Sequence, residues 1–189
     1  MVHKGEGSTN LWHSSSDGTL SVIRVGFKSV VPPGTPLDDF LRASRTILGS
    51  KGFTIEEAAA RETLTVAVDL KDLDVDHCIM GETSMEQEEL FTFRNNLGPR
   101  DIAVYITDSL PPEVRTIGCA AHPAAVPAVV LDQNAVPGTM AHEIAHVLGL
   151  RHVDDSNNLM FPNIGWTNPP PDLTLGQALT IQDSSYSRE

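Results

Sequence analysis

The chain has 189 residues, of which 25 are acidic and 13 are basic, so its formal net charge is −12. This length suits a single domain with a sizeable core. The negative charge argues against nucleic acid and anionic membrane surfaces as partners, and no apolar run is long enough to span a membrane.

The first part of the chain divides into a polar arm and the start of a folded domain. Residues 1–19 are rich in Ser, Gly and Asn and are predicted to form a flexible arm, ahead of a single domain over residues 20–189. Apolar and polar side chains alternate over residues 20–31, which is typical of a half-buried strand. After a Pro-Pro-Gly break, Thr35 is expected to cap a helix that ends at Gly49.

Further strands and helices follow. Thr54 and Glu57 fit a capping box for a short helical turn, although the segment equally suits an extended strand. Alternation predicts a strand over residues 63–70, and Ser84 with Gln87 forms the capping box of a helix expected to run to residue 97. Later elements are strands over residues 101–107 and 128–133, and a last helix after Thr174 with Leu175, Ala178 and Leu179 as its apolar residues.

Two cysteines bear on the redox environment. Cys78 and Cys119 are too few for a disulfide framework and lack CxxC spacing, so a second zinc site built on them is not expected. Two separate thiols are the favoured interpretation, with pairing as the alternative in an exported protein. The first residues lack the apolar core of a signal peptide, which favours the cytoplasm, or secretion if a leader has been removed or a leaderless route is used.

The most informative stretch is HEIAHVLGLRH, residues 142–152. Residues four apart share one face of a helix, so His142 and His146 can bind the same metal ion. Gly149 can end the helix in a backbone conformation that few other residues adopt, and the chain can then turn back to supply His152 as a third ligand. Three protein ligands leave a fourth position open, which is typical of catalytic rather than structural zinc.

Glu143 follows the first histidine, where it can reach a zinc-activated water without binding the metal. The five-residue HExxH pattern is a weak signal by itself. The full HExxHxxGxxH pattern has a chance probability on the order of one in 10⁷ at any one start position. We therefore predict one catalytic Zn²⁺ ion, with Glu143 as the catalytic residue.

Together with Met160, this pattern resembles that of the metzincin clan of zinc endopeptidases, and most closely that of the matrixins. The matrixin context of the methionine, Leu-Met-aromatic-Pro, is matched by residues 159–162. The resemblance implies that the three histidines hold zinc, that Glu143 acts as general base and acid, and that Met160 forms a hydrophobic floor beneath the metal.

The resemblance also implies a substrate pocket formed by Phe161, Pro162 and Asn163, for the side chain that follows the cleaved bond. Clan members with a tyrosine ligand carry it where this chain has Pro162, so no fifth ligand is implied. Asp154 and Asp155 follow the third histidine; one of them could hydrogen-bond the turn and orient His152, or both could face solvent.

The strand just before the zinc helix contains Ala128, Val129 and Val130. It could offer a free edge to an extended substrate, or it could equally be an ordinary internal strand.

The sequence departs from the matrixins in its secondary metal sites. Residues 118–133 offer only His122 and Asp132 as ligands for the structural zinc and calcium that matrixins usually carry there, so neither ion is expected. The aspartates between residues 69 and 76 lack the spacing of an EF-hand, which favours a solvated loop over a calcium site. No propeptide with a cysteine switch is recognisable upstream.

The implied fold class is mixed α and β: a twisted, mostly parallel sheet with an antiparallel edge strand, an active-site helix, a Met-turn and a C-terminal helix. Residues 20–149 would form an upper part with the zinc helix, and residues 150–189 a lower part. The predicted function is a zinc-dependent endopeptidase acting on peptides or proteins, with a monomer expected. The alternatives are a catalytically silent zinc-binding recognition module and a zinc hydrolase of a non-protein amide.

Overall fold

The protein is described here by a computed structural model, which covers residues 21–111, 116–162 and 169–187. The predicted arm at residues 1–19 lies outside these ranges. The strands are β1 (Ser21–Ser29), β2 (Phe53–Glu57), β3 (Glu62–Thr63), β4 (Ile102–Thr107), β5 (Gly118–Cys119) and β6 (Ala128–Asp132). The helices are α1 (Leu37–Gly49), α2 (Met85–Phe91), α3 (Pro137–Val147) and α4 (Leu175–Gln182).

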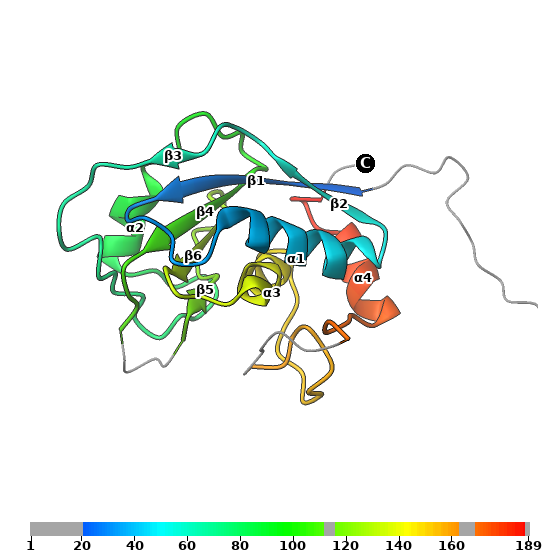
Figure 1. The fold of residues 1–189 in the computed structure, drawn as a ribbon. Coiled ribbons are helices and arrows are strands. Elements are labelled where there is room, and N and C mark those ends of the chain that lie inside the picture. The colour runs from blue at the N-terminus through cyan, green and yellow to red at the C-terminus, as the bar shows by residue number, and fades with distance from the viewer. Residues whose placement is uncertain (1–20, 112–115, 163–168, 188–189) are drawn as a thin grey trace, which may run out of the picture.

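The strands form one six-stranded sheet with helices on both of its faces (Figure 1). The main strand order is β2-β1-β4-β6-β5, and β3 pairs with the end of β1. All pairs are parallel except β5 with β6, which is antiparallel. The predicted fold class, a mostly parallel sheet with an antiparallel edge strand, is confirmed.

Side-chain alternation along β4 shows how the two faces of the sheet are buried. Ile102, Val104 and Ile106 belong to a core that also contains residues of α1, α3 and α4. Ala103 and Tyr105 point to the other face, into a second core with α2 and the loop before it. A strand covered on both faces reads as a continuous apolar run, as β4 does.

Two helix predictions need correction at their ends. Pro36, not Thr35, is the N-cap of α1, because the Thr35 hydroxyl instead donates to the carbonyl of Ala135 at 2.7 Å. The Ser84–Gln87 capping box of α2 is confirmed, but the helix ends at Phe91 rather than near residue 97. The segment beyond it bonds to the sheet instead, since the buried Lys28 ammonium donates to the carbonyl of Asn95 at 2.7 Å.

The segment between α1 and α2 differs most from prediction. Residues 53–57 are extended in β2, so the capping box at Thr54 and Glu57 is wrong. The strand expected over residues 63–70 is limited to β3. Only the last two residues of β1, Lys28 and Ser29, pair with it, so the ladder stops at residue 63. Val68 beyond it is 76% exposed.

The last helix begins as predicted, with a capping box between Thr174 and Gln177. Of its three predicted apolar residues, Ala178 is buried, together with Ile181, whereas Leu175 and Leu179 are exposed. Within the described residues, none of the helices has the length and apolar character needed to cross a membrane.

Cys78 and Cys119 form a disulfide, so their interpretation as separate thiols is wrong. Their Cα atoms are 5.7 Å apart, within the usual range for a disulfide, and the sequence separation is 41 residues. The bond ties the loop before α2 to β5 at the edge of the sheet.

Replacing both cysteines (Cys78→Ser with Cys119→Ser) is expected to lower the free energy of unfolding. Chain-entropy estimates give about 4 kcal/mol for a loop of this length. Chemical denaturation without reductant measures the change. A reductant should bring the wild-type midpoint toward that of the double variant and leave the variant unchanged, whereas equal midpoints without reductant would contradict the prediction.

Candidate active site

Helix α3 and the turn after it bring the predicted metal ligands together. Pro137 occupies the first turn of the helix, where its missing N–H is not needed. The helix ends at Val147, and Gly149 has a φ of +99°, which favours glycine. The N–H of Gly149 donates to the carbonyl of His146 at 2.9 Å, and the N–H of Leu150 donates to that of Ala145 at 3.0 Å. The predicted glycine stop is confirmed, and the chain reverses toward His152.

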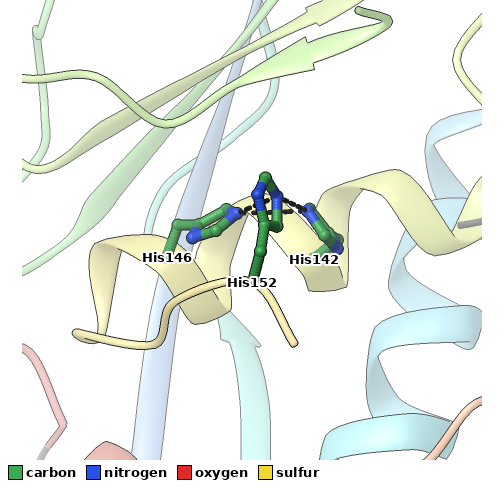
Figure 2. Close-up of side chains that lie close together, drawn as sticks. All are labelled: His142, His146 and His152. Carbon is green, nitrogen blue, oxygen red and sulfur yellow. Dashed lines mark hydrogen bonds between the residues drawn. The ribbon is translucent and has the colours of Figure 1, made fainter. Parts of the chain in front are cut away.

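The three histidines point toward one another, with His142 and His146 on α3 and His152 on the segment that follows (Figure 2). Their Nε2 atoms are separated by 3.1 Å between His142 and His146, 3.2 Å between His142 and His152, and 3.0 Å between His146 and His152. Two nitrogens bound to one tetrahedral zinc ion lie about 3.3 Å apart. The spacing therefore fits a single zinc ion.

The opposite ring nitrogens show why a cation belongs between these rings. Nδ1 of His142 lies 2.6 Å from the carbonyl oxygen of Leu159, and Nδ1 of His146 lies 2.9 Å from that of Leu150. A carbonyl oxygen only accepts, so both Nδ1 atoms carry the hydrogen and both Nε2 atoms present lone pairs. Two lone pairs facing each other at 3.1 Å are stabilised by a shared cation.

Desolvation favours the neutral form of these imidazoles, which is the form that binds a metal. It lowers the pKa of His142 to about 4, and it also lowers the pKa values of His146 and His152. These three residues are the one set of at least three grouped His, Cys, Asp or Glu side chains found within residues 21–111, 116–162 and 169–187.

Glu143 is buried beside this group and lines the same cleft. Burial raises the pKa of its carboxyl to about 8. Gly118 of β5 faces it: a Cβ atom added at Gly118 would lie 2.7 Å from Oε1 of Glu143 and 2.7 Å from Cγ2 of Thr139. The absence of a side chain at Gly118 leaves the space that Glu143 occupies.

The segment around Met160 contacts the ligand group through Leu159, whose carbonyl accepts from Nδ1 of His142. Met160 is fully buried, and its carbonyl accepts from the N–H of Val153 at 3.0 Å. The Asn158 side chain accepts from the N–H of Met160 at 2.9 Å and exchanges two hydrogen bonds, of 2.9 and 3.1 Å, with the Gln177 amide on α4. The last helix therefore holds the Met-turn.

The edge strand of the cleft is β5, not the strand proposed from sequence. Ala128, Val129 and Val130 are fully buried in β6, which pairs with β4 on one side and, through Val130, with Cys119 of β5 on the other. The free-edge role predicted for them is therefore wrong. The cleft, of about 800 Å³, is instead lined by residues in and beside β5, which include Ile117, Gly118 and Ala120.

Of the other predicted site residues, one lines the cleft. Pro162 lines the cleft, Phe161 is half-buried outside its lining, and Asn163 lies outside the described residues. Asp154 and Asp155 are exposed, and the Asp155 carboxylate accepts from the N–H of Asn157 at 3.0 Å. Asp155 therefore holds the turn, and within the described residues neither carboxylate is hydrogen-bonded to His152.

Sequence reasoning did not find β5 or the Asn158–Gln177 pair. A signal for β5 exists, because two short apolar stretches flank a turn-rich segment, residues 122–127, with a proline near each end. Nothing local links Asn158 to Gln177, since the pair forms only when α4 packs beneath the Met-turn.

The family model of the matrixins, which are peptidases, matches residues 65–182, more than half of the chain. The chain belongs to the matrixin family. A search of curated proteins finds no match to this matrixin sequence.

Solved structures share the fold. Metalloproteinase-II from Bacteroides fragilis superposes with a TM-score of 0.62 at 17% identity, over 89% of this chain and 54% of that one, so the matrixin chain spans about half its length. Archaemetzincin from Methanopyrus kandleri gives a TM-score of 0.52 at 15% identity, over 85% of this chain and 93% of that one. A zinc-dependent peptidase from Methanocorpusculum labreanum gives 0.53 at 12% identity, with 84% and 99% covered.

The buried Glu143 carboxyl predicts a pH-dependent stability of the metal-free matrixin chain. The pKa of this carboxyl is raised from 4.5 in the unfolded chain to about 8 in the folded protein. The contribution of Glu143 to the free energy of unfolding is therefore fully present below pH 4.5 and is lost as the pH rises through about 8. Between pH 6 and pH 8 the chelator-treated protein should lose on the order of 2 kcal/mol that Glu143→Gln does not lose. Denaturant titrations of both proteins at the two pH values measure this, and parallel losses would contradict it.

Proposed function

We propose that the protein is a zinc-dependent endopeptidase. The observation that carries this proposal is the convergence of three imidazole Nε2 atoms, 3.0 to 3.2 Å apart, in a cleft that Glu143 also lines. Catalytic zinc sites have three protein ligands and keep a fourth position for water or substrate. His142, His146 and His152 would be the ligands of one Zn²⁺ ion.

The zinc ion, when bound, would supply polarisation of the scissile carbonyl and a lower pKa for the attacking water. Glu143 takes the proton of that water and then passes it to the leaving amine, as general base and acid. Its position suits this task, because Glu143 follows His142 on α3 and lines the same cleft as the three histidines. The hydrogen bonds from Nδ1 of His142 and His146 to carbonyl oxygens hold the two imidazoles in place throughout.

The substrate would bind in extended form along β5. This strand ends the sheet on the side of the cleft, and an extended peptide can add to such an edge through backbone hydrogen bonds. Gly118 then lies between the peptide and Glu143. Pro162 on the opposite wall would contact the side chain that follows the cleaved bond.

Residues 20–189 would act as one catalytic domain, which the cleft divides into residues 20–149 and 150–189. One of the two cores includes both Ile23 and Ile181, from either side of this division, which supports the proposal. The disulfide between Cys78 and Cys119 favours an oxidising compartment over the cytoplasm.

Glu143→Ala is expected to keep zinc and lose at least about 10²- to 10⁴-fold in turnover, because the proton acceptor is removed and the ligands are not. His146→Ala should lose zinc as well. Elemental analysis and cleavage of a mixed peptide library test both variants, and a chelator should stop the wild type until zinc is restored. Undiminished turnover by Glu143→Ala would refute the assignment.

The same peptide library separates the alternatives. Cuts inside peptides identify an endopeptidase. A zinc-loaded protein that hydrolyses no peptide and no amide would be a silent recognition module, and one that hydrolyses only non-protein amides would be a different zinc hydrolase.

Gly118→Ala is expected to lower kcat by about 10- to 100-fold, because the new methyl group would displace the Glu143 carboxyl. Zinc content should be unchanged, since the three histidines are untouched. Gly49→Ala is the matched control, because a Cβ atom added at Gly49 meets nothing within 4 Å. If both variants keep wild-type kcat, Gly118 has no part in placing Glu143.

A further inference from the structure

One arginine side chain lines the cleft and, within residues 21–111, 116–162 and 169–187, has no hydrogen-bond or ion-pair partner. Arg151 is exposed, lies between Leu150 and His152, and contributes to the cleft wall. Several other arginines are engaged: Arg24, Arg42 and Arg61 pair with carboxylates, and Arg45 and Arg94 donate to backbone carbonyls. Among the described residues, Arg151 makes neither kind of contact.

The residues on both sides of Arg151 are tied to the ligand group. The N–H of Leu150 donates to the carbonyl of Ala145 at 3.0 Å, and the carbonyl of Leu150 accepts from Nδ1 of His146 at 2.9 Å. On the other side, the Nε2 atom of His152 lies 3.0 Å from that of His146. The guanidinium therefore projects from a point held on both sides by the ligand group.

The charge of the cleft differs from that of the whole protein. The chain carries a net charge of −12, yet among the described residues that line the cleft Glu143 is the one carboxylate. The guanidinium of Arg151 presents a planar set of donors that matches a carboxylate. At long range the net negative charge of the protein repels an anionic peptide. Selectivity for an anionic peptide therefore has to come from a direct contact inside the cleft.

We propose that Arg151 binds a carboxylate of the substrate next to the scissile bond, so that the enzyme prefers acidic peptides. The carboxylate is either an Asp or Glu side chain or the free C-terminus of a short peptide. This inference rests on the proposed peptidase function. Arg151 is a specificity-determining residue in it and takes no part in the proton transfers.

The test uses matched fluorogenic peptides that differ only in having Glu, Gln or Lys at each position flanking the cleaved bond, each as a free acid and as a C-terminal amide. For the wild type, Glu at one position should raise kcat/KM by about tenfold or more over Gln. Arg151→Gln should remove that ratio, and Arg151→Glu should shift the preference to Lys. Arg100→Gln is the matched control, because Arg100 is exposed and outside the cleft lining, so it removes the same net charge elsewhere.

The two sources of the carboxylate give different results. A preference that persists in amidated peptides identifies a side chain, and one that is lost on amidation identifies the C-terminus. Equal cleavage of the Glu and Gln peptides by the wild type, together with indifference to amidation, would overturn the inference. So would an equal loss toward every peptide in Arg151→Gln.

A binding measurement separates this inference from the proposed function. Fluorescence anisotropy of the same peptides with zinc-loaded Glu143→Ala, with and without Arg151→Gln, reports recognition without turnover. If no peptide is cleaved but acidic peptides bind about tenfold tighter through Arg151, the function fails and the carboxylate subsite stands. Cleavage without any acidic preference in either assay gives the reverse result.

Discussion

The site depends on holding three imidazole nitrogens 3.0 to 3.2 Å apart with their lone pairs facing inward. That arrangement is unfavourable without a cation, so the rest of the fold has to enforce it. Two carbonyl groups do so, and both come from segments that follow the helix: Leu150 from the turn and Leu159 from the start of the Met-turn. The segment that supplies His152 thus also orients the two histidines on α3.

The parts of this centre that sequence could predict are those determined by residues close in the chain. The spacing of His142 and His146 on one helix face and the glycine stop need only a few neighbouring residues, and both appear as expected. The same is true of the capping boxes at Ser84 and Thr174, in which a side chain bonds a backbone group three residues away.

The errors share a different cause, which is competition for partners across the fold. Residues 63–70 have the alternation of a strand, but β1 pairs with this segment through two of its residues and then ends. The sequence suggests that β6 lies at an exposed edge of the sheet because it directly precedes α3. In the structure β5 pairs with β6 and is itself the edge strand. The disulfide partner of Cys78 is likewise set by where β5 lies, 41 residues away.

The amide pair between Asn158 and Gln177 constrains how this protein can change over evolution. Asn158 is buried, and Gln177 serves two structures at once, the start of α4 and the base of the Met-turn. Losing either amide alone leaves a polar group without its partner, which costs about 1–3 kcal/mol when the group is buried. Positions 158 and 177 should therefore vary together among related sequences. The residue at position 177 is thus constrained by the ligand site, although α4 contributes none of the three histidines.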